Sequence, residues 1–171
     1  MFMNRKFFLA IYPVVILLLI VLISCNKKKP LFVQLSSSKT NISFANNLEK
    51  KKMLNILYYL YYYNGAGVAT GDINNDGLPD VYFAANSKGN NKLYLNKGNF
   101  EFEDITDKAK VAGTADWCTG VTMADVNSDG YLDIYVSTVS GKYGLTGHNE
   151  LFINNKDNTF TEQSTEYGLN T

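Results

Sequence analysis

Two short segments of the sequence carry oxygen-bearing side chains at the same spacing. Residues 72–80 read D-I-N-N-D-G-L-P-D and residues 125–133 read D-V-N-S-D-G-Y-L-D. Each segment has aspartate or asparagine at positions 1, 3, 5 and 9 and glycine at position 6. Alternate side chains of a tight loop converge on one centre, and calcium accepts several oxygen ligands in flexible geometry. The spacing therefore predicts two calcium-binding loops.

We expect each loop to supply four side-chain ligands and the backbone carbonyl of its seventh residue. The candidate ligands are Asp72, Asn74, Asp76, Asp80 and the carbonyl of Leu78 in the first loop, and Asp125, Asn127, Asp129, Asp133 and the carbonyl of Tyr131 in the second. Gly77 and Gly130 allow the sharp turn, because glycine has no Cβ to oppose a positive φ. The alternative is a pair of solvated turns. We favour the calcium loops over plain turns, because three carboxylates within nine residues would repel one another without a cation.

The sequences around the loops exclude an EF-hand. The twelfth position, which would be a bidentate glutamate, is Phe83 in one copy and Val136 in the other. The segments that enter and leave the loops are short and rich in β-branched and aromatic residues, which predicts strands. These segments are residues 67–71 and 120–124 on the entering side and residues 81–85 and 134–138 on the leaving side.

The two loops belong to a longer internal repeat. They lie 53 residues apart (125 − 72), and residues 64–86 match residues 117–139 at eight of 23 positions. Strands predicted at residues 92–96 and 100–106 complete a unit of four strands. From the third strand onward the offset is 58, because the second unit has five extra residues in a loop at 139–150, between its second and third strands. His148, the single histidine, lies in that loop, and we interpret it as an ordinary loop residue.

The N-terminus has the pattern of a secretion signal. Basic residues precede an apolar run at 7–23, and Leu22-Ile23-Ser24-Cys25 is similar to the lipobox of bacterial lipoproteins. We expect residues 1–24 to be a signal peptide, Cys25 to be acylated, and residues 25–30 to tether the protein to the membrane of the bacterial cell envelope, at the outer membrane or cell surface. An uncleaved membrane-spanning helix is the alternative.

Residues 31–63 give weaker signals. The segment NILYYLYYY at 55–63 predicts a strand from the β-propensity of tyrosine, although Leu48, Met53, Leu57 and Leu60 leave a helix open. Its tyrosines could stack on sugars or pack between sheets with their hydroxyls at the edge. Cys118 is the cysteine left once Cys25 is acylated, and we expect it to be a small buried apolar residue.

The composition and the residue inventory give no support for nucleic-acid binding or for catalysis. The 16 basic and 16 acidic residues balance to a formal net charge of zero, which gives no indication of nucleic-acid binding. No nucleophile–base pair or histidine cluster is present, and the aspartates of the loops are assigned to metal. The sequence therefore predicts no catalytic site.

The repeated residues resemble the FG-GAP/VCBS repeat. The resemblance rests on G-V-x-x-G-D-x-N-x-D-G-x-x-D at 67–80 and G-V-x-x-x-D-x-N-x-D-G-x-x-D at 120–133. Asp104-Ile105-Thr106, followed by Ala109 and Val111, is similar to the linker of bacterial ASPIC/UnbV-type members. The resemblance implies blades of an integrin-α-like β-propeller that bind calcium in the loop between the first two strands of a blade.

We therefore expect an all-β fold, a partial β-propeller. Residues 64–113 and 114–171 would form two four-stranded blades, and residues 31–63 an N-terminal partial blade. A propeller has about four to eight blades, so we expect the chain to be a fragment whose partners include the remaining blades of a longer parent. The function expected is non-catalytic binding of an extracellular glycan or protein. The alternative is a fragment of a propeller hydrolase or lyase whose active site lies in missing blades.

Overall fold

The computed structural model of the protein describes residues 30–48 and 54–170. The chain divides into two compact units, Met1–Gln34 and Leu35–Thr171. The predicted signal peptide and the lipidation site Cys25 lie outside the described residues. Within the part of the chain that is described, no helix has the length and apolar character needed to cross a membrane.

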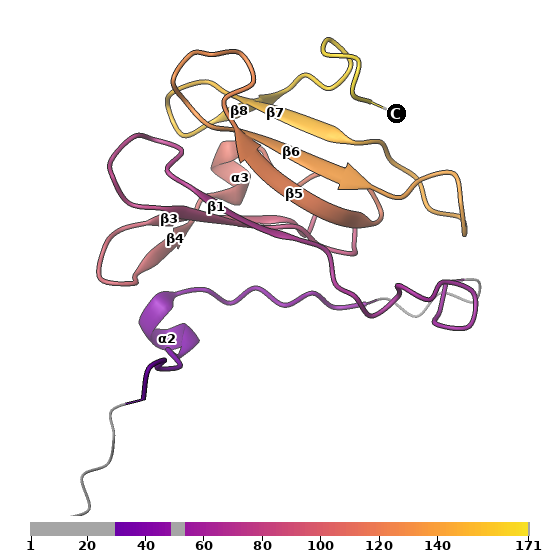
Figure 1. Cartoon of the computed structure of the whole chain (residues 1–171), viewed down its shortest axis with the longest axis horizontal. Coiled ribbons are helices and arrows are strands. Elements are labelled where there is room, and N and C mark those ends of the chain that lie inside the picture. Colours follow the sequence, from indigo (N-terminus) through magenta and orange to yellow (C-terminus); the bar gives the residue numbers. More distant parts are fainter. Residues whose placement is uncertain (1–29, 49–53, 171) are drawn as a thin grey trace, which may run out of the picture. The chain divides into compact units, whose positions relative to one another are not determined.

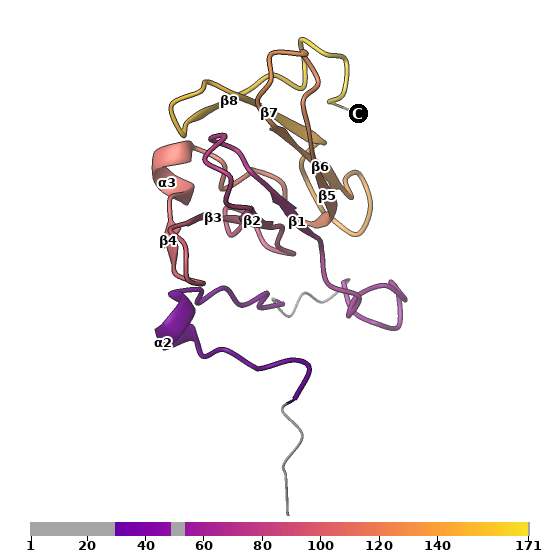
Figure 2. The same cartoon turned by 60° about the vertical axis from the view of Figure 1, so that its left-hand side comes forward.

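Two four-stranded antiparallel sheets form the larger unit (Figures 1 and 2). The first contains β1 (Val68–Gly71), β2 (Asp80–Phe83), β3 (Lys92–Asn96) and β4 (Phe102–Asp104), and the second contains β5 (Cys118–Ala124), β6 (Asp133–Thr138), β7 (Glu150–Asn154) and β8 (Phe160–Glu162). Each strand pairs with the next one along the chain. The predicted all-β class with four strands per repeat is confirmed, although the fourth strand of each sheet is only three residues long.

The main hydrophobic core lies between the two sheets. Alternation along a strand sends successive side chains to opposite faces of a sheet. Each repeat contributes apolar side chains that are no more than 3% exposed. These are Ile73, Tyr82 and Leu93 from the first repeat, with Ile73 in the loop after β1, and Ile134, Val136 and Phe152 from the second. The backbones come close at Gly67, where an added Cβ would lie 2.9 Å from the Val121 nitrogen. Glycine is therefore required at this contact.

A single helical turn connects the sheets. The helix α3 (Thr106–Ala109) follows β4 and ends at Lys110, which has a left-handed φ of 62°. Ala109 and Val111 are fully buried in the inter-sheet core. The linker thus forms part of the core and fixes where the second sheet begins.

The segment before the first sheet is irregular within the described residues. The short helix α2 (Ser37–Thr40) has no buried residue. An extended stretch follows, in which Phe44 stacks on Phe83 with ring centroids 4.8 Å apart. The Asn46 amide donates to Asn86 Oδ1 at 2.7 Å, and the Asn86 N–H donates back to Asn46 Oδ1 at 2.9 Å. This stretch therefore covers part of the face of the first sheet that points away from the second.

The strand predicted at 55–63 is wrong. The segment forms turns closed by local backbone hydrogen bonds. Tyr59 N–H donates to the Asn55 carbonyl at 2.9 Å, and Tyr62 N–H donates to the Tyr59 carbonyl at 3.0 Å. Leu54 makes an isolated bridge, and no strand forms in the described part of residues 31–63. The expected partial blade is therefore not formed there. Tyr59 and Tyr62 pack on Trp117 instead of pairing along a sheet edge.

Candidate functional site

The first predicted calcium loop joins β1 to β2 and is organised by its own side chains. The Asp72 carboxylate accepts the N–H of Asp76 at 3.1 Å and of Gly77 at 2.7 Å. Asn74 accepts the Asp76 N–H at 3.2 Å, and its amide donates to the Asp76 carboxylate at 3.0 Å. The loop therefore brings the oxygens of three predicted ligands to one place.

The second loop joins β5 to β6 and repeats this arrangement bond for bond. Asp125 accepts the N–H of Asp129 at 3.0 Å and of Gly130 at 2.9 Å. Asn127 accepts the Asp129 N–H at 3.0 Å and donates to its carboxylate at 3.1 Å. The seventh residue, Tyr131, donates its N–H to Asp129 at 2.9 Å, as Leu78 does to Asp76 at 2.8 Å. The two loops are structural as well as sequence repeats.

The ninth residues, Asp80 and Asp133, have a structural role that the sequence did not predict. Both are buried, at 0% and 1% exposure. Each carboxylate accepts two backbone N–H groups, one inside its loop and one at the end of the third strand of its sheet. The donors are Ile73 (3.0 Å) and Asn96 (2.7 Å) for Asp80, and Val126 (3.0 Å) and Asn154 (2.8 Å) for Asp133. These bonds connect each loop to its sheet.

The donor chemistry of the loops fits a hard cation. All the predicted ligands present oxygen, and a carboxylate oxygen that accepts one hydrogen bond keeps a second lone pair. Among residues 30–48 and 54–170, however, no group of three or more carboxylate, imidazole or thiolate side chains is close enough to hold a metal ion. The structure thus brings the side chains of positions 1, 3 and 5 of each loop close together, whereas the carboxylate of position 9 is hydrogen-bonded to backbone N–H groups.

The electrostatic surroundings of individual carboxylates differ. Burial raises the pKa of Asp80, although the N–H groups of Asn96 and Ile73 oppose this shift. For Asp129, desolvation opposes ionisation, but hydrogen bonds from Tyr131, Asn127 and Lys156 outweigh it and lower the pKa. The ammonium of Lys156 lies 3.4 Å from Asp129 Oδ2 and 5.3 Å from the ring centroid of Tyr131. The positively charged ammonium of Lys156 therefore lies beside the second loop.

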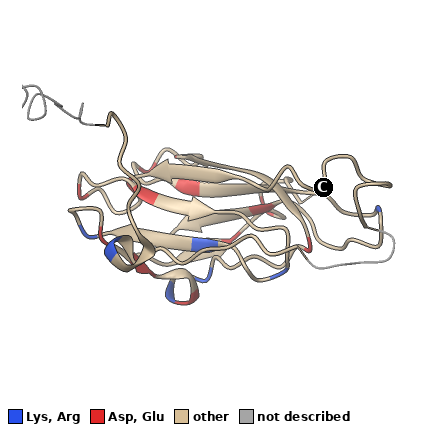
Figure 3. Cartoon of the chain, turned by 90° about the horizontal axis from the view of Figure 1, so that it is seen from below, with Lys and Arg blue, Asp and Glu red and all other residues tan. Residues whose placement is uncertain are grey.

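One hydrogen bond links the two calcium loops, and a second links the first loop to the end of β7 in the second sheet. The Asn75 amide donates to the Gly130 carbonyl at 3.0 Å, and the Asn154 amide donates to the Ile73 carbonyl at 2.8 Å. Both calcium loops therefore lie at the same end of the paired sheets. Figure 3 marks the acidic and basic residues along the ribbon, and both kinds occur in the strands as well as in the loops.

A second candidate site is an aromatic pocket of about 480 Å³. It forms where the tyrosine turns meet the longer loop of the second repeat, and it is lined by Tyr58, Tyr59, Leu60, Tyr61, Val139, Lys142 and Tyr143. Beneath it, Tyr62 stacks on Trp117 at 5.5 Å, and Tyr59 meets the same indole edge-on at 6.0 Å. Tyr58 and Tyr61 remain 58% and 62% exposed. Some tyrosines therefore form a core and others present their rings to solvent.

Cys118 is buried, as predicted, at 1% exposure. Burial raises the pKa of its thiol to about 11. His148 lines a shallow pocket beside Glu150, whose Oε1 accepts the N–H and hydroxyl of Thr114 at 2.6 and 2.8 Å. Sequence reasoning missed Glu150, which is only 1% exposed and holds the linker to β7. The available signal was an acidic residue at the start of the strand ELFIN, directly before three apolar residues.

The sequence profile of the FG-GAP-like repeat matches residues 72–136. The chain thus contains an FG-GAP-like repeat, and its two four-stranded sheets form a partial propeller-like arrangement. It is 37% identical over 84 residues to cartilage acidic protein 1 of Xenopus tropicalis. The proteins of the same name from Mus musculus and Homo sapiens are 36% and 34% identical over 84 residues. The alignments cover 49% of this chain and 13% of each relative, so the chain matches a small part of their length.

Proposed function

We propose that this protein is a non-catalytic, calcium-stabilised binding module that is lipid-anchored at the bacterial cell envelope. The observation that carries the proposal is the matching hydrogen-bond pattern of the two loops. In each loop, the side chains at positions 1 and 3 accept the same backbone N–H, that of position 5. The carboxylate of position 5 in turn accepts the side-chain amide of position 3. Such convergence of acidic groups favours a bound cation, because neighbouring carboxylates destabilise one another without one.

Calcium would be held by Asp72, Asn74 and Asp76 in the first loop, and by their counterparts Asp125, Asn127 and Asp129 in the second. The carbonyls of Leu78 and Tyr131 and the free lone pairs of Asp80 and Asp133 complete the proposed ligand sets. A bound cation supplies charge neutralisation and a crosslink within the loop. Extracellular calcium modules often bind at about 10⁻⁴–10⁻³ M, which suits a structural metal.

The aromatic pocket is the proposed ligand surface. Tyrosine offers a large rigid ring with a polar tip, a combination suited to recognition at little cost in conformational entropy. The pocket presents several such rings beside Lys142 and rests on the buried Trp117. A glycan would stack on the ring faces and bond to the hydroxyls, and a protein ligand is the alternative.

Anchoring rests on the N-terminal sequence. The apolar run ends at Leu22-Ile23-Ser24-Cys25, and acylation of Cys25 would attach the module to a membrane. The remaining blades of a longer parent chain are further proposed partners, because two sheets leave apolar surface for others to cover.

The metal is tested by thermal unfolding of residues 26–171 with calcium and with chelator. At calcium ten times its Kd, each site should add about 1.4 kcal/mol, a rise in Tm of several degrees. The double variant Asp76→Ala, Asp129→Ala should lose the rise. The variant Glu103→Ala, Glu166→Ala, which removes two exposed acidic residues outside the loops, should keep it. A melt that calcium does not change would contradict the metal sites.

Ligand binding is tested separately on a panel of immobilised oligosaccharides with calcium present. Tyr61→Ala, Tyr143→Ala should abolish binding, whereas Tyr167→Ala, also at an exposed tyrosine, should leave it unchanged. Equal binding by all three proteins would remove the aromatic pocket from the proposal.

A further inference from the structure

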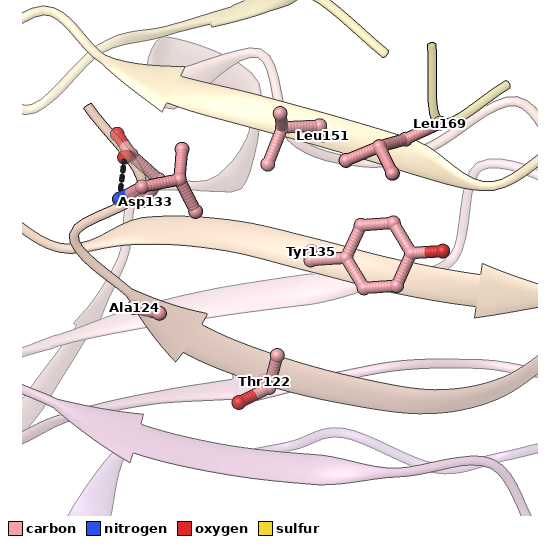
Figure 4. A pocket seen from close by; sticks show the side chains of 7 residues that line it. Thr122, Ala124, Asp133, Tyr135, Leu151 and Leu169 are labelled. Atoms are coloured by element: carbon pink, nitrogen blue, oxygen red, sulfur yellow. Dashed lines mark hydrogen bonds between the residues drawn. The ribbon is translucent and has the colours of Figure 1, made fainter. Parts of the chain in front are cut away.

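The strand β7 begins with an acidic residue that faces the first sheet. Figure 4 shows the next residue, Leu151, in a pocket on the other face of the second sheet, together with Tyr135 and Leu169. Successive side chains of a strand point to opposite faces. Glu150 therefore lies on the same face as Phe152, which is part of the inter-sheet core.

Only one oxygen of the Glu150 carboxylate is hydrogen-bonded, although the residue is buried. Its Oε1 accepts the N–H and the hydroxyl of Thr114 at 2.6 and 2.8 Å. Its Oε2 has no hydrogen-bond partner in the part of the chain that the structure describes. The neighbouring wall is the backbone of Gly113, where φ is 76° and an added Cβ would lie 2.8 Å from Oε2. A buried acceptor without a partner is costly, because burial removes it from water.

The first repeat has an ion pair at the corresponding place. Subtracting 58 maps Glu150 onto Lys92 and Glu162 onto Asp104. The ammonium of Lys92 lies 3.0 Å from Asp104 Oδ2. In the second repeat both positions are acidic, so the positive member of the pair is replaced by a second carboxylate.

Glu162 offers a second acceptor near Glu150. It pairs with Phe152 across the sheet, and such diagonal neighbours lie about 7–8 Å apart, within reach of long side chains. The N–H groups of Leu151 and Ser164 both donate to Glu162 Oε1, at 3.3 and 2.8 Å. Desolvation opposes the ionisation of Glu162, but hydrogen bonds from Ser164 and Leu151 outweigh it and lower the pKa of this carboxyl. Its Oε2 is therefore available as a charged acceptor.

Both carboxylates line a pocket of about 350 Å³. Its other lining residues include His148, Lys110 and Phe152. Lys110 is exposed and makes no ion pair within the described residues. With a neutral imidazole, two carboxylates and one ammonium leave one negative charge of the pocket uncompensated.

The chemistry of this pocket favours an organic cation over a metal ion. No three carboxylate, imidazole or thiolate side chains of the described residues are close enough to hold a metal. A primary ammonium does not need such a cluster, because its three N–H donors can bond to acceptors on different sides. The ring of Phe152 lines the pocket and offers an apolar surface for the stem of such a cation.

We propose that this pocket binds a primary ammonium group on an aliphatic stem, with its N–H donors directed to Oε2 of Glu150 and Oε2 of Glu162. The ligand supplies the positive charge that Lys92 supplies in the first repeat. A free alkylamine and the lysine side chain of a partner peptide share this chemistry. The site goes beyond the proposed function, because it depends on neither calcium nor the aromatic pocket.

Calorimetric titration of the protein with n-butylammonium chloride tests the site, and 1-butanol is the uncharged control with the same stem. The amine should bind saturably and the alcohol should not. Glu150→Gln keeps an acceptor for Thr114 but removes the charge, so it should weaken amine binding by about tenfold or more. Glu162→Gln should also weaken binding and does not alter a buried group. Glu166→Gln, at an exposed acidic residue outside the pocket, should leave binding unchanged.

The peptide acetyl-Gly-Lys-Gly-amide distinguishes the two sources of the ammonium. Tighter binding of the peptide than of n-butylammonium would assign the pocket to a protein partner, and weaker binding would assign it to a free amine. The absence of saturable binding by both probes, or equal affinity of the unaltered protein, Glu150→Gln and Glu162→Gln, would overturn the proposal. Binding that appears only in Lys110→Gln would also overturn it, because that lysine would then be the cation of the pocket. Chelator should change none of these results, so failure of the calcium sites leaves the test intact.

Discussion

The two sheets have the same topology and matching loops but opposite surroundings on one face. Tyr82 is fully buried, and its hydroxyl donates to the Val111 carbonyl at 2.7 Å. Its counterpart Tyr135 is only partly buried and borders the pocket of the second sheet. Equivalent residues of the two repeats should therefore contribute different amounts to the free energy of unfolding, because a repeat buries this face only when a neighbouring sheet covers it.

The largest effect should come from truncating matched apolar residues on this face. Ile73→Ala should lower the free energy of unfolding by about 2–5 kcal/mol, because it opens a cavity between the sheets. Val126→Ala should change it by less than about 0.5 kcal/mol, as for most exposed sites. Urea unfolding followed by circular dichroism measures both. Equal losses would show that the second sheet covers the first less completely than the structure indicates.

The ninth loop residues, Asp80 and Asp133, should not show this difference between the repeats, because both are buried. Asp80→Ala and Asp133→Ala each leave two backbone N–H groups without their acceptor. Each unsatisfied buried group costs about 1–3 kcal/mol, so both variants should lose at least about 2 kcal/mol in chelator. Measuring without calcium separates this structural role from metal binding. Loss only in the presence of calcium would mean that these carboxylates act as ligands alone.

A smaller contrast is expected for the tyrosine hydroxyls. Tyr82→Phe removes the bond to Val111 and should cost about 1 kcal/mol, the usual net value for such a bond. Tyr135→Phe should have almost no effect in the present chain. Urea unfolding measures both variants. A loss for Tyr135→Phe as large as that for Tyr82→Phe would contradict the contrast between the buried and the half-buried hydroxyl.

The sequence predicted those features that depend on local spacing. The loops, the strands beside them and the third strand of each sheet follow from alternation and from the internal repeat, whose offset is 53 residues at the loops and 58 at the third strands. The tyrosine segment was misassigned because β-propensity reports packing on a sheet, which the sequence alone could not supply. The role of Asp80 also escaped prediction, since one of its donors, Asn96, lies 16 residues away at the end of another strand.

The smallest effect should distinguish the two calcium loops. Lys156 borders Asp129 in the second loop, whereas the corresponding residue of the first repeat is Gly98, which has no side chain. A cation entering the second loop would meet this ammonium, so the second site should bind calcium more weakly than the first. Lys156 is about half exposed, and surface pairs of this kind are worth no more than about 1 kcal/mol. Lys156→Gln should therefore tighten calcium binding at the second loop by at most about fivefold. Calorimetric titration of the single-loop variants Asp76→Ala and Asp129→Ala, each with and without Lys156→Gln, assigns the change to one site. Tightening at the first loop as well would mean that the lysine acts through the overall charge and not through its contact with Asp129.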